Sequence, residues 1–371
     1  MPIDNQSLLN RFLTYVQIPS ETGHEQPMTD RLVADLTAMG CAVTTDDVHD
    51  RANTTGANVY ATLAGDPTLP PILFSAHMDT VTPGVGIRPQ VCDDGYVRSD
   101  GTTILGGDDK AGICAIMEAL SAAKDIPNRP TIEAAFTVRE ESGLVGAKTL
   151  DYSRILSKQC IVLDSSGSAN DIIVGAPGQN TITATIIGRK AHAGVAPEEG
   201  ISAIQVGAHA VAAMNLLRVD HETTCNIGTF SAAGATNIVT ERVDLVLECR
   251  SLNNEKLTAH TQHLVDCMQS ACDKFGATLE CTVTTSYLGY HHDQTTPLVQ
   301  RVFDACKAQN LTPNPTTSGG GSDANIYNQH GITALNLGVG MEKVHTTAEQ
   351  LSIRDMEASA ALCLHLMTAP S

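Results

Sequence analysis

Histidine and acidic residues stand where apolar runs of this chain end, and this pattern constrains the fold more than any other feature. His77 and Asp79 follow one run in the segment SAHMDT, and Asp164 closes another in IVLD. Glu140 and Glu141 follow a third run in TVREESG. Strands of an α/β domain are apolar because both faces of the sheet are covered, and functional groups gather beyond their carboxyl ends. The pattern therefore predicts an α/β fold with a largely parallel sheet.

Two further residues extend this set. Asp108 follows two glycines and opens an expected helix in LGGDDKAG, and His345 follows an expected strand at 333–337. Neutral imidazole and carboxylate are ligands that zinc and similar divalent ions accept. A hydrolase with two such ions also needs one carboxylate that stays off the metals and moves protons. The residue types and their order therefore predict a two-metal hydrolase.

Each member of the set also has an ordinary structural interpretation. Asp79 and Asp164 could be turn residues, because aspartate hydrogen-bonds to the backbone of turns. Asp109 would serve as a helix cap, and the pair Glu140–Glu141 could open a solvated helix. His345 could be a surface-loop histidine. Each alternative is acceptable singly, but five of them in this order would be a coincidence.

The middle of the chain has a different order of elements. Residue alternation predicts strands at 181–188, 226–230, 243–250 and 278–285, and helical spacing predicts helices at 200–217 and 254–275. The order β-α-β-β-α-β is that of a ferredoxin-like unit. We therefore expect residues 178–288 to form an inserted domain, and residues 1–177 and 289–371 to form a discontinuous catalytic domain.

Composition limits the partners and the compartment. The net charge of −18, from 23 basic and 41 acidic residues, argues against nucleic acid and anionic membrane as partners. No apolar run reaches the ~18 residues of a membrane helix, and residues 1–40 read as helix rather than as a signal peptide. The 11 cysteines are scattered and without a C-x-x-C pair, so we expect free thiols and a cytoplasmic protein.

Three residues of the expected inserted domain are candidates for substrate binding. His192 lies in the glycine-containing segment RKAHAGVAPEEG, Asn237 in GATNIV, and Arg250 at the end of the strand LVLECR. The ordinary alternatives are a loop histidine, a turn residue and a structural ion pair. The chain has no G-x-S-x-G, P-loop or dinucleotide-binding motif, which argues against a serine hydrolase or a nucleotide enzyme.

These segments resemble the motifs of one known family. SAHMDT resembles its H-x-D motif, LGGDDKAG its bridging-aspartate motif and REESG its E-E motif. The family is the co-catalytic zinc peptidases, which include peptidase T, carboxypeptidase G, the zinc aminoacylases and succinyl-diaminopimelate desuccinylase. The resemblance covers essentially the whole chain, and DGTTILGGDDKAG is most similar to the peptidase T branch. The loop GGGSDAN at 319–325 departs from peptidase T, which has an arginine-bearing loop with Thr-Asp-Gly.

The resemblance implies a fold and a set of roles. The fold would be a zinc-exopeptidase-like three-layer catalytic domain with a mixed, largely parallel sheet, and an inserted ferredoxin-like α+β lid or dimerisation domain. Its roles would be these: His77 and Asp164 bind one metal, Glu141 and His345 bind the other, Asp108 bridges them, Glu140 is the general base and Asp79 orients His77. His192, Asn237 and Arg250 would hold the substrate, and the inserted domain would form a homodimer.

The expected activity is hydrolysis of an amide bond in small peptides, as in a peptidase T-like aminopeptidase of di- and tripeptides. An N-acyl amino acid deacylase or a carboxypeptidase of the same family is the alternative, since Arg250 would suit any substrate that ends in a carboxylate. A metal-binding homologue without activity would lack the base or a ligand, whereas Glu140 and all five ligands are present. Zinc is the expected metal, and manganese and cobalt also suit such a site.

Overall fold

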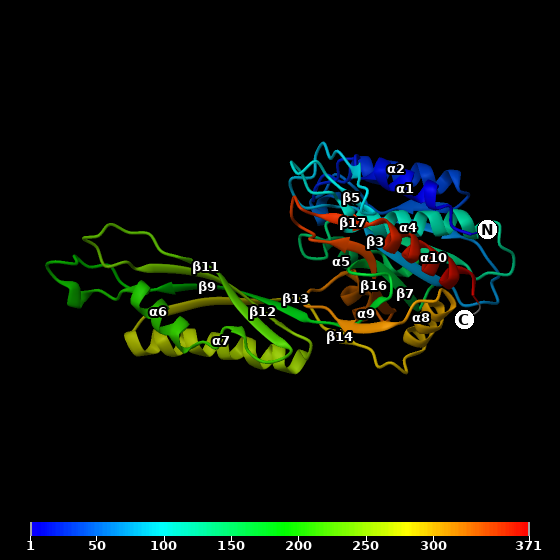
Figure 1. Ribbon diagram of the computed structural model, residues 1–371. Coiled ribbons are helices and arrows are strands. Elements are labelled where there is room, and N and C mark those ends of the chain that lie inside the picture. Colours follow the sequence, from blue (N-terminus) through cyan, green and yellow to red (C-terminus); the bar gives the residue numbers. More distant parts are fainter. Residues whose placement is uncertain (1, 370–371) are drawn as a thin grey trace. The chain divides into compact units, whose positions relative to one another are not determined.

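The computed structural model describes residues 2–369, and the chain divides into two compact units (Figure 1). The first unit takes the chain as far as residue 175, then 292–318, and then the part from 322 onward. The second unit takes 176–291 together with the short segment 319–321. An excursion of the chain therefore forms a unit of its own, and the first unit is discontinuous in sequence.

A mixed sheet forms the centre of the first unit. Its middle strands run parallel in the order β6 (Ile132–Thr137), β3 (Ile72–His77), β7 (Gln159–Ser166) and β16 (Thr333–Glu342). Every residue of β3 and β6 is buried, so both faces of these strands are covered. This is the α/β fold predicted from the sequence. The outer strands are β1 (Ala42–Thr45), β2 (Val59–Leu63), β4 (Gln90–Val91), β5 (Tyr96–Arg98), β8 (Asp171–Ala176), β15 (Asn314–Thr317) and β17 (Gln350–Ser352).

Helices cover this sheet on both sides (Figure 1). Helices α4 (Gly107–Ala123) and α10 (Ile353–Thr368) pack against each other and against the central strands, and α9 (Asp323–Gln329) contacts β7 and β16. The remaining helices are α1 (Asn5–Tyr15), α2 (Gln26–Ala38), α3 (His49–Ala52), α5 (Val145–Thr149), α8 (Pro297–Ala308) and the 3₁₀ turn η1 (Tyr152–Arg154).

The interpretation of residues 1–40 as one helical stretch is wrong in detail. Two helices, α1 and α2, are separated by residues 16–25. This linker contains Pro19, which cannot donate a helical hydrogen bond, and Gly23, whose φ of 88° lies in the left-handed region. The apolar spacing predicted the buried faces correctly, because Leu8 and Phe12 are fully buried, but it does not indicate the break between the two helices.

Helix α4 is almost wholly buried, and it lies unusually close to β7. A Cβ atom on Gly112 would lie 1.9 Å from the main-chain oxygen of Leu163, so only glycine fits at this point. Asp108 and Asp109 have non-helical backbone angles, so the regular helix begins after them. The close contact fixes the start of α4 against the strand that carries Asp164.

The second unit is an antiparallel sheet with two helices on one face. Its elements are β9 (Gly178–Ile187), η2 (Pro197–Glu199), α6 (Ala203–Ala213), β10 (Leu217–Arg218), β11 (Thr223–Ser231), β12 (Arg242–Ser251), α7 (Asn254–Phe275), β13 (Thr278–Tyr287) and β14 (Tyr290–His291). The strand order is β10-β11-β12-β9-β13. Apart from the two-residue β10, the elements before β14 follow the expected β-α-β-β-α-β order. Ile182, Ala184 and Ile186 of β9 point into the core beneath the helices, and the alternate threonines face outward.

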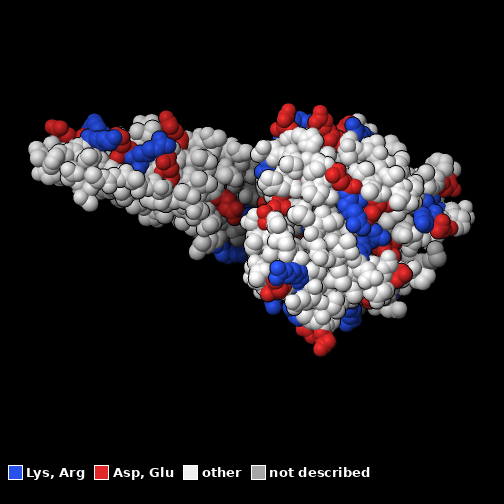
Figure 2. Space-filling view, turned by 90° about the horizontal axis from the view of Figure 1, so that it is seen from above, with Lys and Arg blue, Asp and Glu red and all other residues white. Residues whose placement is uncertain are grey.

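The surface carries side chains of both charges, and the cysteines are free thiols. On the face of the first unit that Figure 2 shows, blue basic side chains are interspersed with red acidic ones. All eleven cysteines lie in the described part of the chain and are free thiols. Among residues 2–369, no helix has both the length and the apolar character needed to span a bilayer.

The close contact at Gly112 gives a stability prediction. Gly112→Ala should lower the free energy of unfolding by about 1–3 kcal/mol, the usual cost of overpacking a core. Alanine gains about 1 kcal/mol over glycine in a helix, but the clash with a main-chain oxygen outweighs this gain. Gly319→Ala is the control, since a Cβ there would have no neighbour within 4 Å. Chemical denaturation measures both variants, and an unchanged midpoint for Gly112→Ala would contradict the prediction.

Candidate metal centre

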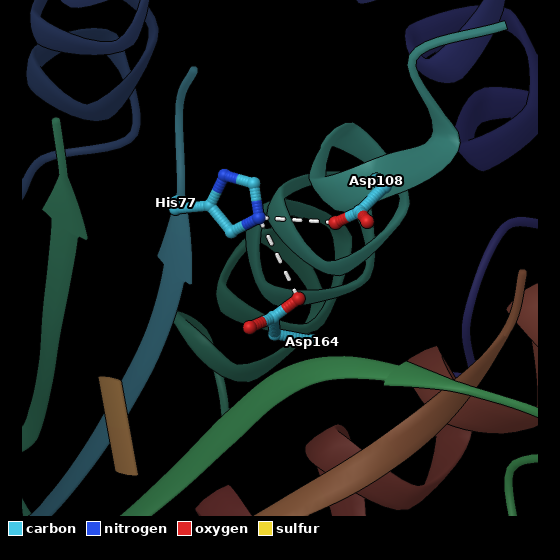
Figure 3. A group of neighbouring side chains, drawn as sticks. All are labelled: His77, Asp108 and Asp164. Carbon is cyan, nitrogen blue, oxygen red and sulfur yellow. Dashed lines mark hydrogen bonds and ion pairs between the residues drawn. The ribbon is translucent and has the colours of Figure 1, made fainter. Parts of the chain in front are cut away.

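His77 presents one ring nitrogen to two carboxylates. It is the last residue of β3, and its Nδ1 lies 2.9 Å from the main-chain oxygen of Asp79, so Nδ1 carries a proton. The other nitrogen, Nε2, lies 3.0 Å from Oδ1 of Asp108 and 3.5 Å from Oδ1 of Asp164. Figure 3 shows both carboxylates pointing toward this nitrogen, one from the start of α4 and one from β7. The three side chains could share one ion.

Asp108 faces two histidines at once. Its Oδ1 is directed at His77, and its Oδ2 lies 3.3 Å from Nε2 of His345. The same His345 nitrogen lies 2.9 Å from Oε1 of Glu141. Two donor groups therefore share Asp108, and within each group the candidate ligand atoms lie within 4.8 Å of one another. All five predicted ligands come together, from five different parts of the first unit.

The Asp79 carboxylate contacts both the His77 ring and the loop that carries Glu140 and Glu141. Its Oδ1 lies 3.4 Å from Nδ1 of His77, but the same oxygen accepts a hydrogen bond of 2.8 Å from the main-chain N–H of Glu140. Oδ2 accepts from the N–H of Glu141 at 3.3 Å and from the hydroxyl of Thr22 at 2.8 Å. The buried Asp79 carboxylate therefore fixes the loop that carries the predicted base and a predicted ligand.

Glu140 lies in a setting that suits a proton carrier. Its carboxyl is buried, and this burial, together with the nearby charges of Asp164 and Asp323, raises the pKa of Glu140 well above its ordinary value. A carboxylate with a raised pKa accepts a proton more readily than an ordinary one, as a general base must. Glu140 is absent from both donor groups, whereas its neighbour Glu141 is present in one.

The ligand residues perturb one another strongly. Burial alone would lower the pKa of His77, but the carboxylates of Asp164 and Asp108 outweigh it and raise that pKa well above the usual value. Burial, Asp108 and Glu141 together raise the pKa of Asp164 to about 7. Hydrogen bonds to Asp108 and Glu141 raise the pKa of His345 to about 10. Protons on the two imidazoles thus balance the carboxylate charge.

This donor set fits divalent metal ions. Two imidazoles and three carboxylates are nitrogen and oxygen ligands of the kind that zinc, manganese and cobalt accept. The negative charge crowded around the rings of His77 and His345 also supports metal binding, because a cation at either place would be stabilised by these carboxylates. A bound ion would replace the protons on Nε2 of each ring.

Three acidic residues near the site were not predicted as site residues. Asp109 accepts from the N–H of Gly112 at 3.2 Å, as a cap would, but its other oxygen accepts from the main-chain N–H of His77 at 3.1 Å. Asp323 opens α9, and its buried carboxyl accepts a hydrogen bond of 2.5 Å from Thr137. Glu349 binds the loop before Asp108. The only sequence signal for Asp323 was its position after the glycine-rich segment, and Glu349 had none.

The three predicted substrate-binding residues lie in the second unit. His192 is exposed in the loop after β9, and the N–H of Ala193 donates to the main-chain oxygen of Asn237 at 2.9 Å, so these two loops are adjacent. Arg250 lies at the opposite end of β12, where it forms an ion pair of 3.0 Å with Glu248. At about 3.3 Å per strand residue, the two ends are roughly 26 Å apart. One small peptide cannot contact His192 and Arg250 of the same chain.

Residues 73–369 match the model of peptidase family M20/M25/M40. The chain belongs to this family. It is 41% identical to protein YqjE of Bacillus subtilis (strain 168) over 366 residues, which cover 98% of each chain. The crystal structure of aminopeptidase PepT from Bacillus cereus ATCC 10987 shows 41% identity and a TM-score of 0.93, with 98% of each chain covered. A tripeptidase structure from Staphylococcus aureus subsp. aureus Mu50 shows 39% identity and a TM-score of 0.95, covering 99% of this chain and 98% of that one.

Membership in this family confirms the class of enzyme that the motifs predicted. The chain is a metal-dependent, peptide-cleaving hydrolase of the M20 family, and its resemblance to the peptidase T branch is confirmed by the aminopeptidase and tripeptidase structures. The similarity extends over nearly the whole chain, so it includes the second unit as well as the unit that carries the donor groups.

Metal binding should release protons. With a pKa of about 10, His345 is protonated at neutral pH in the metal-free protein and must lose its proton to bind an ion. Zinc affinity at this position should therefore rise with pH as far as about pH 10, by roughly tenfold per pH unit for each proton released. Calorimetric titration in buffers of different ionisation enthalpy counts these protons. His221→Gln, at an exposed histidine of the second unit, should leave the count unchanged. A zinc affinity that stays constant between pH 6.5 and 9 would rule out this competition.

Proposed function

We propose that this protein is an aminopeptidase of small peptides, acting on di- and tripeptides with two divalent ions, most simply zinc. The observation that carries the proposal is the pair of donor groups that share Asp108 and lie beside the buried Glu140. The names of the two similar structures, an aminopeptidase and a tripeptidase, support the substrate class. Manganese and cobalt would suit the same oxygen and nitrogen ligands.

In this proposal each site residue has one task. His77 and Asp164 would hold one ion, Glu141 and His345 would hold the other, and Asp108 would contribute to both donor groups. When bound, the ions would polarise the scissile carbonyl and lower the pKa of the attacking water. Glu140 takes the proton from that water and delivers it to the leaving amine. Asp79 keeps Glu140 in place through its hydrogen bond to the Glu140 N–H.

Substrate recognition is assigned to the second unit. Arg250 offers a planar fork that suits a carboxylate, His192 offers a donor to the oxyanion of the tetrahedral intermediate, and Asn237 an amide for the substrate backbone. Because His192 and Arg250 lie at opposite ends of β12, they would serve the same substrate only if they came from different copies.

A homodimer formed through the second unit would meet this requirement. The strand β13 lies at the edge of its sheet and is exposed at most positions, which leaves backbone groups available for pairing across a two-fold axis. Light scattering that found a monomer at micromolar concentration would contradict the dimer.

The free thiols support a cytoplasmic location.

An N-acyl amino acid deacylase or a carboxypeptidase is the second candidate function. Arg250 supports it, because the substrates of both enzymes end in a carboxylate. The two candidates differ in the bond that is cut and in the group that is released, so a panel of substrates separates them. An inactive homologue is disfavoured, since Glu140 and the complete donor groups are present.

Replacing the base should affect turnover and leave the metal content unchanged. Glu140→Gln keeps the size of the side chain but cannot accept the proton, so kcat should fall by at least about 10²-fold while two ions remain bound. Elemental analysis and steady-state kinetics measure the two quantities. Glu357→Gln, on helix α10, is the matched control and should keep normal turnover. Near-normal turnover in a metal-loaded Glu140→Gln protein would refute the assignment.

The substrate class can be tested together with Arg250. Metal-loaded protein should release the amino-terminal residue from di- and tripeptides faster than it deacylates N-acyl amino acids, as read by the new amine. Arg250→Ala should mainly raise KM for substrates with a free carboxylate, and much less for amidated ones. Arg242→Ala is the matched control, since Arg242 lies on the same strand and pairs with Asp244 at 2.6 Å. Faster release from N-acyl amino acids would favour the deacylase, and equal losses on free and amidated substrates would remove the role of Arg250.

A further inference from the structure

Glu349 has a buried carboxylate that the proposed reaction does not use. It lies four positions after His345, just before β17, and the residue is 1% exposed. A buried carboxylate costs free energy unless it is paired or hydrogen-bonded. The partners of Glu349 therefore indicate what the residue does.

All the hydrogen bonds recorded for this carboxylate come from one loop. Oε2 accepts from the main-chain N–H groups of Leu105 at 2.8 Å and Gly106 at 2.9 Å. Oε1 accepts from the N–H of Asp108 at 3.0 Å. A Cβ atom on Gly107 would lie 3.1 Å from Oε1, so the loop wraps closely around the carboxylate. Three amides held by one charged acceptor fix the path of the backbone that presents Asp108.

Glu349 also belongs to the segment that carries His345. The N–H of Glu349 donates to the main-chain oxygen of Thr346 at 3.1 Å, which closes a turn directly after His345. His345 itself has a half-exposed side chain and a φ of 63°, so it receives little support from a packed core. Asp108 and Glu349 are 241 positions apart in sequence. Glu349 thus joins two segments, one carrying Asp108 and the other His345, that each supply a ligand atom to the donor group of Asp108, Glu141 and His345.

We infer that Glu349 is a positioning residue for the donor group formed by Asp108, Glu141 and His345. It holds the loop before Asp108 at a fixed distance from the turn after His345 before any ion binds. The ion therefore has to order less of the backbone when it binds. The inference rests on the proposed two-metal function. Glu349 belongs to neither donor group, and it acts only through the backbone of Asp108 and the turn after His345.

The test compares zinc binding by the metal-free full-length protein and two variants. Wild type should bind two ions in competition with a chromogenic chelator. In Glu349→Gln an amide NH₂ must face at least one of the three N–H groups, so one ion should bind about 10- to 100-fold more weakly, the usual effect of losing a partner outside the ligand set. The affinity for the other ion should change less, and excess zinc should restore activity.

Glu342→Gln is the matched control. Glu342 lies on β16 and accepts hydrogen bonds from the hydroxyl of Tyr96 at 3.0 Å and from Gln350 at 2.6 Å. Its replacement removes a partly buried carboxylate from the same region but leaves the loop 105–108 untouched. Both zinc affinities should stay at the wild-type values. Equal weakening in the two variants would mean that loss of a carboxylate in this region has only a general effect, and would overturn the inference.

Three outcomes remain separable. If wild type binds fewer than two ions, the proposed two-metal function fails, and the inference fails with it. If wild type binds two and Glu349→Gln binds both with unchanged affinity, the inference alone fails. If circular dichroism shows that Glu349→Gln does not fold, Gly107→Ala replaces it, because the new Cβ presses on Oε1 while every carboxylate is kept. Unchanged zinc affinity in Gly107→Ala would then overturn the inference.

Discussion

Burial of many carboxylates in one place is the constraint on which the centre of the first unit depends. Water cannot solvate these groups, so each needs hydrogen-bond donors or cations from the protein. Main-chain amides supply many of them: Asp79 takes those of Glu140 and Glu141, and Asp109 takes that of His77. The acidic residues are therefore the links between separate loops, and the backbone around the site is held by the charges that the site contains.

This arrangement explains why the site could be predicted from sequence and its supports could not. His77 and Asp164 terminate or lie within apolar strands, and such local patterns are visible in a single chain. Asp108 was recognisable from the two glycines before it. The acceptor role of Glu349 depends on amides 241 positions away, and no local pattern records such a pairing. The same holds for Asp323, whose hydrogen bond to Thr137 joins α9 to β6.

The fold shows the same division between local and distant information. The parallel central strands of the first unit and the four long strands of the second unit were predicted from apolar runs and alternation, because burial acts on each strand directly, whereas short outer strands such as β4 and β17 were not predicted. The break between α1 and α2 depended on Pro19 and Gly23, which were present in the sequence but outweighed by the helical spacing around them. In the second unit, the assignment of His192 and Arg250 to substrate binding stays a prediction, and the length of β12, which separates the two residues, could not be connected with that assignment from local patterns.

The discontinuity of the first unit has a consequence for the order in which the two donor groups arise. His77, Asp108 and Asp164 all precede residue 176, where the second unit begins. His345 is synthesised only after that unit is complete. Chains emerge from the ribosome N-terminal end first, at about 5–20 residues per second, so all three residues of the first donor group leave the ribosome well before His345, the last residue of the second group. A nascent chain thus contains all the residues of one donor group while the other group still lacks His345.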